Sequence, residues 1–120
     1  MRLSVKTTRC DLTPEISAYI DERVGSLQKL IHAEDDDAVI CEVEIEKVAE
    51  RQHGLIWRAE MNLTINGTLY RADAVGENIN AALDEVKDEM MKRLRRSNKK
   101  HRDLFRRGAL KMKNFIRFGR

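Results

Sequence analysis

Residues 57–74 read WRAEMNLTINGTLYRADA and predict a β-hairpin. Apolar and polar side chains alternate on either side of Asn66-Gly67, and this dipeptide is typical of a two-residue type I′ turn, in which both residues need a positive φ. Such a short loop also sets the register of the strands, so that apolar side chains meet along one face. The predicted partners are Ile65 with Thr68, Leu63 with Tyr70, Met61 with Ala72 and Ala59 with Ala74.

The sequence before the hairpin predicts two further strands and a helix. Apolar and polar residues alternate over residues 3–6 and again over residues 39–46, where the pattern is that of a strand with one buried and one solvated face. Between them, Thr13 and Pro14 are typical of a helix N-cap and a first helical position. Apolar residues recur at spacings of three and four over residues 16–31, so we expect the helix to run through this whole stretch.

The sequence after the hairpin predicts a last helix. Asn78 is a suitable N-cap, and apolar residues follow at helical spacing. We expect this helix to end near Gly108, which divides the chain into one domain of residues 1–107 and a short basic tail of residues 108–120. The predicted buried stripe consists of Ile79, Ala82, Leu83, Val86, Met90 and Leu94.

The resulting order, β-α-β-β-β-α, predicts an α+β fold. Because each strand has one apolar face and each helix one apolar stripe, we expect a four-stranded sheet with two helices packed on one face. The first β-α-β connection should be right-handed, which makes the first two strands parallel. The other strands then form an antiparallel meander, with Cys41 as a small core residue.

Charge is distributed very unevenly along the chain. Residues 1–86 contain 9 Lys and Arg against 17 Asp and Glu, residues 87–120 contain 14 against 3, and the whole chain has a net charge of +3. Such an asymmetry indicates a polyanionic partner at the C-terminal end. Nucleic acid and acidic lipid headgroups both fit, but barely three helical turns separate Gly108 from Gly119, so a membrane contact is the poorer explanation.

The basic residues of the last helix are candidate RNA contacts. Asp88 can reach Lys92 and Asp103 can reach Lys99 at a spacing of four, but most of the positive charge has no acidic partner. Like charge without partners destabilises a helix unless a polyanion neutralises it. Arg23 and Lys29 in the first helix are weaker candidates, with an ordinary surface position as the alternative. The predicted ribosomal RNA contacts are Arg23, Lys29, Lys92, Arg93, Arg95, Arg96, Lys99, Lys100 and Arg102.

The C-terminal residues offer a further set of candidate RNA contacts, in which aromatic and basic side chains are interleaved. Aromatic side chains near Arg stack on bases in proteins that bind single strands. An added apolar contact and a disordered chain end are the alternatives, and the pattern does not choose among them. These candidates are Arg106, Arg107, Lys111, Lys113, Phe115, Arg117 and Phe118.

The solvated face of the sheet has the opposite character. Glutamates of the second and third strands share this face with Arg58 and Arg71. Cross-strand pairs of opposite charge are favourable, so we expect both arginines to pair within the sheet. The acidic face should then be turned away from RNA.

The sequence contains no pattern that supports catalysis, a metal site or a cofactor. Its three His are scattered and form no catalytic pair with Cys10 or Cys41, and the acidic run at residues 35–37 lacks the spaced ligands of a calcium loop. We therefore predict that the protein is not an enzyme and has no small-molecule substrate. No apolar run is long enough to span a membrane, and two distant cysteines without a signal peptide indicate the cytoplasm.

Several local motifs occur together over roughly residues 1–102. They are Leu12-Thr13-Pro14-Glu15-Ile16, Tyr19-Ile20, Leu27-Gln28-Lys29-Leu30, the Asn66-Gly67 hairpin with Tyr70-Arg71-Ala72, and Glu77-Asn78-Ile79-Asn80-Ala81-Ala82-Leu83-Asp84. In this combination the chain resembles the ribosome hibernation-promoting factor and ribosome-associated translation inhibitor family, in its short form. Asn78, Asn80 and Glu89 depart from the residues that are usual in the family.

The resemblance implies a fold like a double-stranded-RNA-binding domain with an added strand. It also implies binding to the small ribosomal subunit, in the channel of mRNA and tRNA, with ribosomal RNA phosphates held by the basic faces of both helices. Translation would be blocked sterically, in bacteria under stress or in stationary phase. The long members of the family pair ribosomes through an additional C-terminal domain, and with only a short tail this chain is not expected to do so.

Two other functions fit the same residues. A general RNA-binding regulatory protein, not specific to the ribosome, would bind unrelated duplexes as tightly as ribosomal subunits. A protein-interaction module would use the acidic face of the sheet and would not need the basic helix.

Overall fold

The computed structural model describes the backbone of residues 1–33 and 36–119, and the side chains of these residues other than 36, 105 and 108–119. The order of elements is the predicted one, with two short 3-10 helices added. The elements are β1 (Arg2–Thr8), α1 (Pro14–Gly25), η1 (Gln28–Leu30), η2 (Asp36–Ala38), β2 (Val39–Lys47), β3 (Trp57–Ile65), β4 (Thr68–Gly76) and α2 (Ile79–Gly119).

The four strands form one sheet in the order β1-β2-β3-β4. β1 is parallel to β2, and the other two pairs are antiparallel, which confirms the predicted topology. Asn66 and Gly67 have φ values of 50° and 85°, as a type I′ turn requires. All four residue pairs predicted across the hairpin are present in the register of β3 and β4.

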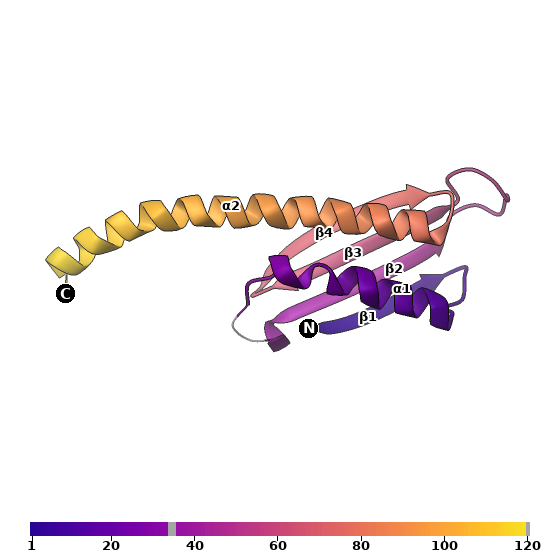
Figure 1. Ribbon diagram of the computed structural model, residues 1–120, viewed down its shortest axis with the longest axis horizontal. Coiled ribbons are helices and arrows are strands. Elements are labelled where there is room, and N and C mark those ends of the chain that lie inside the picture. The colour runs from indigo at the N-terminus through magenta and orange to yellow at the C-terminus, as the bar shows by residue number, and fades with distance from the viewer. Residues whose placement is uncertain (34–35, 120) are drawn as a thin grey trace.

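Both helices cover the same face of the sheet, α1 beside β1 and β2 and α2 over β3 and β4 (Figure 1). The core lies between the layers, and Cys41 is fully buried within it, as predicted. Every other residue of the strands points inward, so the core face is almost entirely apolar. Its largest fully buried side chains are those of Ile20, Leu27, Cys41, Val43, Ile45, Met61, Leu63, Leu83, Val86, Met90 and Leu94.

The first helix is shorter than the sequence predicted. α1 begins as expected, with the Thr13 hydroxyl accepting a hydrogen bond from the Ile16 N–H at 3.2 Å, but it ends at Gly25. The Ser26 side chain ends it by donating to the carbonyl of Arg23 at 2.6 Å. The 3-10 turn η1 follows and keeps Leu27 buried. The spacing of the apolar residues therefore predicted a continuous buried stripe correctly, but α1 and η1 share this stripe.

The last helix is longer than predicted, since α2 continues through Gly108 to Gly119 and contains 41 residues, about 60 Å. A single glycine costs only about 1 kcal/mol in a helix interior, and Leu, Arg, Lys and Met around it are good helix formers. The expected helix end near Gly108 is therefore wrong. Leu94 is the last buried residue that the structure describes in α2, and from there the helix extends away from the sheet (Figure 1).

Gly76, the last residue of β4, allows α2 to begin directly above the sheet. A Cβ atom at this position would lie 2.7 Å from the backbone nitrogen of Ala82 and 3.2 Å from the Ala81 Cβ. Those atoms belong to the first turn of α2, which is held by the core and cannot move aside cheaply.

We predict that Gly76→Ala lowers the free energy of unfolding by about 1–3 kcal/mol, because the added methyl group overpacks the junction. Gly25→Ala is the matched control, since a Cβ there has no heavy atom within 4 Å. This control should be neutral or stabilise by up to about 1 kcal/mol. Urea unfolding followed by circular dichroism measures both, and equal stability of the two variants would contradict the packing argument.

Candidate nucleic-acid interface

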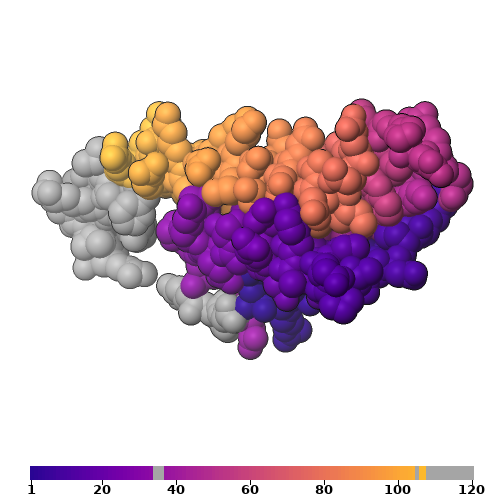
Figure 2. Space-filling view, turned by 45° about the vertical axis from the view of Figure 1, so that its right-hand side comes forward, coloured from indigo at the N-terminus to yellow at the C-terminus, as the bar shows by residue number. Residues whose placement is uncertain are grey.

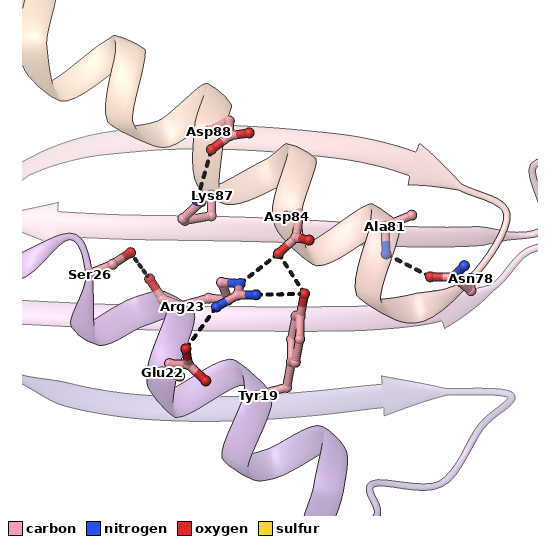
Figure 3. A network of polar contacts seen from close by, with 9 residues as sticks. All are labelled: Tyr19, Glu22, Arg23, Ser26, Asn78, Ala81, Asp84, Lys87 and Asp88. Atoms are coloured by element: carbon pink, nitrogen blue, oxygen red, sulfur yellow. Dashed lines mark hydrogen bonds and ion pairs between the residues drawn. The ribbon is translucent and has the colours of Figure 1, made fainter.

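The start of α2 is fixed by its N-cap and by its apolar stripe. The side-chain oxygen of Asn78 accepts a hydrogen bond from the Ala81 N–H at 2.7 Å, which confirms the predicted cap (Figure 3). The stripe from Ala82 to Leu94 then packs into the core. Together they set the direction in which the later, charged part of the helix leaves the domain.

A polar clamp ties α1 to α2 at this end of the helix pair (Figure 3). One carboxylate oxygen of Asp84 accepts hydrogen bonds from Arg23 Nε at 2.6 Å and from the Tyr19 hydroxyl at 2.7 Å. Arg23 Nη2 also donates to the Tyr19 oxygen at 2.9 Å, and its guanidinium lies 4.2 Å from the centre of the Tyr19 ring. The three side chains therefore form a closed network between the helices.

The clamp changes the ionisation of its members. Burial raises the pKa of Asp84, but the hydrogen bonds from Arg23 and Tyr19 outweigh it, and the net result is a lowered pKa. The hydrogen bond to Asp84 raises the pKa of Tyr19, and the same carboxylate raises the pKa of Arg23. Arg23, a predicted RNA contact, is thus already engaged inside the domain, with 26% of its side chain exposed. Its contact with RNA stays a prediction.

The middle of α2 carries a dense positive charge, which we call the basic segment and define as residues 92–107. Nine of its sixteen residues are Lys or Arg, and Asp103 is its one acidic residue. All nine are exposed. Among the described side chains, no carboxylate lies within ion-pair distance of any of them. Asp88, which could have reached Lys92, contacts Lys87 instead at 2.9 Å.

The predicted contacts of α2 from Lys92 to Arg107 lie on this segment, and they line different hollows along it. Arg102 and Arg106 line a groove on the side of η1, and Arg96, Lys99, Lys100 and Arg107 line a second hollow further round the helix. Arg93 is separated from both groups, because it lines a hollow beside Arg58 and Arg71 at the edge of β4. With a rotation of about 100° per residue, the nine positive side chains of the segment cover about half of its circumference.

The remaining candidate RNA contacts, Lys29 and the C-terminal residues, lie outside the basic segment. Lys29 is exposed on η1, and η1 packs against α2 through a hydrogen bond from Asn98 Nδ2 to the Leu30 carbonyl at 3.0 Å. This contact brings Lys29 to the same end of the domain as the basic segment. The backbone of the C-terminal candidates belongs to α2, but their side chains lie outside the described part of the structure. These are Lys111, Lys113, Phe115, Arg117 and Phe118.

Two contacts that the sequence did not predict brace α2 where it leaves the sheet. The Tyr70 hydroxyl and the Ser97 hydroxyl are 2.7 Å apart, and Asn98 bonds to Leu30 as described above. Neither Ser97 nor Asn98 belongs to the apolar stripe. Polar residues at these two positions follow no periodic pattern in the sequence, so only the tertiary structure reveals the two contacts.

The outer face of the sheet pairs its own charges, as predicted. Arg71 donates to Glu60 at 2.9 Å, and Arg58 lies 3.3 Å from Asp73 and 3.4 Å from Glu60. The hydrogen bond from Arg71 lowers the pKa of Glu60 despite its partial burial. The arginines of this face are therefore neutralised, unlike those of the basic segment.

Two classes of site find no support in the described residues. They contain no group of three or more His, Cys, Asp and Glu side chains that could hold a metal ion. The described helices also include none that is both long and apolar enough to cross a membrane.

We predict that Asp84→Asn lowers the free energy of unfolding at pH 7 by about 1 kcal/mol, a value reduced for the exposure of the carboxylate. Because the pKa of Asp84 is lower in the folded state, its contribution is present above the unfolded pKa near 3.8 and is lost as the pH falls through the folded value. The difference from the unaltered protein should therefore be constant between pH 5 and pH 7, as estimated from this linkage, and shrink below about pH 4.

Asp88→Asn is the matched control for this substitution. Its carboxylate contacts the neighbouring Lys87 and is 61% exposed, so we expect a change of less than about 0.5 kcal/mol. Denaturant titrations from pH 3 to pH 7 measure both variants. A loss for Asp84→Asn that does not change with pH would contradict an ionic clamp.

Comparisons with known proteins agree with this architecture. The N-terminal domain of Thermus thermophilus Protein Y superposes with a TM-score of 0.65 at 21% identity, covering 80% of this chain and 98% of that one. A ribosomal subunit interface protein from Coxiella burnetii gives a TM-score of 0.64 at 11% identity, covering 82% and 98%. At these identities the likeness shows the fold alone. A search among curated proteins found no match.

A family model provides the assignment that the structures alone cannot. The model described as "Sigma 54 modulation protein / S30EA ribosomal protein" matches residues 3–102, which is most of the chain. This is a non-enzymatic family of ribosome-binding proteins, in agreement with the prediction that the chain is not an enzyme. The chain belongs to the sigma 54 modulation protein / S30EA ribosomal protein family, as the resemblance of its motifs predicted.

Proposed function

We propose that this protein is a translation-inhibiting hibernation factor. It binds the ribosomal RNA of the small subunit through the basic segment of α2 and sterically blocks the channel of mRNA and tRNA. The single observation that supports this most strongly is the set of nine exposed Lys and Arg residues, which have no carboxylate partner among the described side chains. The proposal includes a cytoplasmic location and a role under stress or in stationary phase.

The shape of the basic segment suits a phosphate-lined surface. Sixteen helical residues span about 24 Å, so a positive charge occurs about every 2.7 Å along the axis. Counterions released from RNA phosphates supply most of the binding free energy of such a surface. Because the charges spread over about half of the circumference, the helix can contact phosphates on both flanks of its exposed side. Recognition then depends on shape and phosphates rather than on base edges.

The rest of the domain orients this helix. The acidic residues on the outer face of the sheet are repelled by phosphates, so the domain can approach RNA only with α2 and η1 foremost. The clamp between Arg23 and Asp84 and the core below Leu94 hold the helix at a fixed angle. A helix of about 10–12 Å in diameter, inserted in this way, occupies space that a nucleic acid strand would need.

A general RNA-binding regulatory protein is the competing function, since phosphate contacts alone do not select the ribosome. The two functions differ in one measurable quantity. A hibernation factor binds small subunits more tightly than it binds an unrelated RNA duplex of equal length. Equal affinities for the two would support the general binder.

We predict that replacing Arg95, Arg96, Lys99 and Lys100 by Gln abolishes co-sedimentation with purified small subunits at moderate salt. Gln keeps the helix propensity and most of the side-chain length, so the fold should persist. If about six phosphates are contacted, the log–log salt slope of the unaltered protein should be about −4 to −5. Losing four contacts should reduce it to about −1 to −2.

A second quadruple variant controls for net charge. Replacing Arg2, Lys6, Arg9 and Arg51 by Gln removes the same charge from exposed positions outside α2. This variant should bind with nearly the original affinity. If both variants lose binding equally, the effect is one of overall charge, and the assignment of the basic segment is contradicted.

A further inference from the structure

A groove of about 750 Å³ opens where α2 passes the segment that follows α1 (Figure 2). Its floor is apolar and contains Leu94, which is buried, and Leu30 and Ile65, which are half-buried. The β3–β4 turn closes one end of it, and the basic segment forms the opposite wall. Its volume lies in the range of sites for small ligands.

The walls of the groove combine flat rings with positive charge. Its lining includes three residues with flat rings, Tyr70, His32 and His101, and two arginines, Arg102 and Arg106. Flat rings over an apolar floor favour a planar heteroaromatic group, which can stack on them. Guanidinium groups beside such a slot favour a phosphate attached to that group. The combination matches one nucleotide.

The amide side chains of the groove add hydrogen-bonding groups for the edge of a base. Asn98 Nδ2 donates to the Leu30 carbonyl at 3.0 Å, and Asn66 Nδ2 donates to the His32 carbonyl at 3.5 Å. Both amides are thereby oriented, and each nitrogen keeps a second N–H beside a side-chain oxygen, so the amides can pair with the edge of any base. The preference among bases comes from stacking, which favours the larger ring system of a purine.

We propose that this groove binds a single unpaired nucleotide of the RNA, with a purine base on the apolar floor and its phosphate against Arg102 and Arg106. The inference rests on the proposed function and adds a base-selective contact to a surface that otherwise reads only phosphates. An RNA source is favoured over a free nucleotide because the groove is continuous with the basic segment, so the strands flanking the bound nucleotide would meet further Lys and Arg residues.

Fluorescence anisotropy with labelled RNA hairpins tests the proposal on the full chain. The three probes share one stem and differ in carrying a single bulged adenosine, a single bulged uridine or no bulge. We expect the adenosine bulge to bind about tenfold more tightly than the paired stem, which is the effect of one stacked base, and more tightly than the uridine bulge. Equal affinities for all three hairpins would overturn the proposal.

Two groove variants and one control locate the effect. His101→Ala removes a stacking ring at an exposed helix position, and Thr68→Leu fills part of the groove from an exposed position at the start of β4, with a side chain that cannot stack on a base. Each should reduce the preference for the bulge to less than about twofold, as expected for the loss of one stacking contact, with little effect on the paired stem. Lys100→Ala, on the other side of α2, should weaken all three hairpins equally and keep the preference.

The remaining outcomes are also decisive. A preference that survives both groove variants overturns the proposal, because the nucleotide would then bind elsewhere. Displacement of the bulged hairpin by micromolar adenosine monophosphate also overturns it, since the groove would then be a site for a free nucleotide. Co-sedimentation with small subunits is measured in parallel. If the protein binds subunits but shows no bulge preference, only the proposed nucleotide site is refuted. If it shows a bulge preference but does not bind subunits, the proposed function is refuted.

Discussion

The packing of the first four turns of α2 against the sheet is the constraint on which the rest of the structure depends. Leu83, Val86, Met90 and Leu94 are all nearly or fully buried. Each contributes roughly 1.5–3 kcal/mol as an upper estimate, whereas a pair of like charges one helical turn apart costs only about 0.2–0.5 kcal/mol. The anchor therefore outweighs the repulsion in the segment that follows. A helix with this charge can be held at a fixed place only because its first part belongs to the core.

The separation of charge has the same origin. On the outer face of the sheet, Arg58 pairs with Asp73 and Arg71 pairs with Glu60, so both arginines have ion-pair partners within the domain. Most of the basic segment lies past Leu94, and no described carboxylate is within ion-pair distance of its Lys and Arg residues. The arginines on the outer face of the sheet are thus paired and that face is net acidic, whereas the Lys and Arg residues of the basic segment have no ion-pair partner among the described carboxylates. This difference gives the molecule a single face with which to approach a polyanion.

Local chemistry explains how much the sequence could predict. The hairpin, its register and both helix N-caps depend on residues within a few positions of one another, such as Asn66 with Gly67 and Thr13 with Ile16, and all were confirmed. The two errors concern helix ends. Periodicity cannot tell one helix from a helix followed by a 3-10 turn with the same buried stripe, and a glycine is a weak stop signal inside a run of good helix formers.

The candidate site was predictable in part for the same reason. Residues 92–107 stand out by composition alone, but the engagement of Arg23 by Asp84 joins positions 61 residues apart. The bond from Asn98 to Leu30 joins positions 68 apart. No pattern in the chain connects such pairs, since each depends on the angle at which α2 crosses the domain. The groove, whose walls come from three separate regions, was beyond sequence reasoning altogether.

The basic segment also links stability to binding. Past Leu94 its described side chains gain little from the core, and an isolated helix of this length is marginal in water even without repulsion. Phosphates that neutralise its nine positive charges remove the repulsion and so stabilise the helical form that binds them. Part of the affinity for RNA is therefore the relief of an electrostatic cost that the free protein carries. Salt also screens the repulsion among these Lys and Arg residues in the free protein. High salt therefore weakens binding in two ways, because it screens the phosphates and because it leaves less repulsion for RNA to remove.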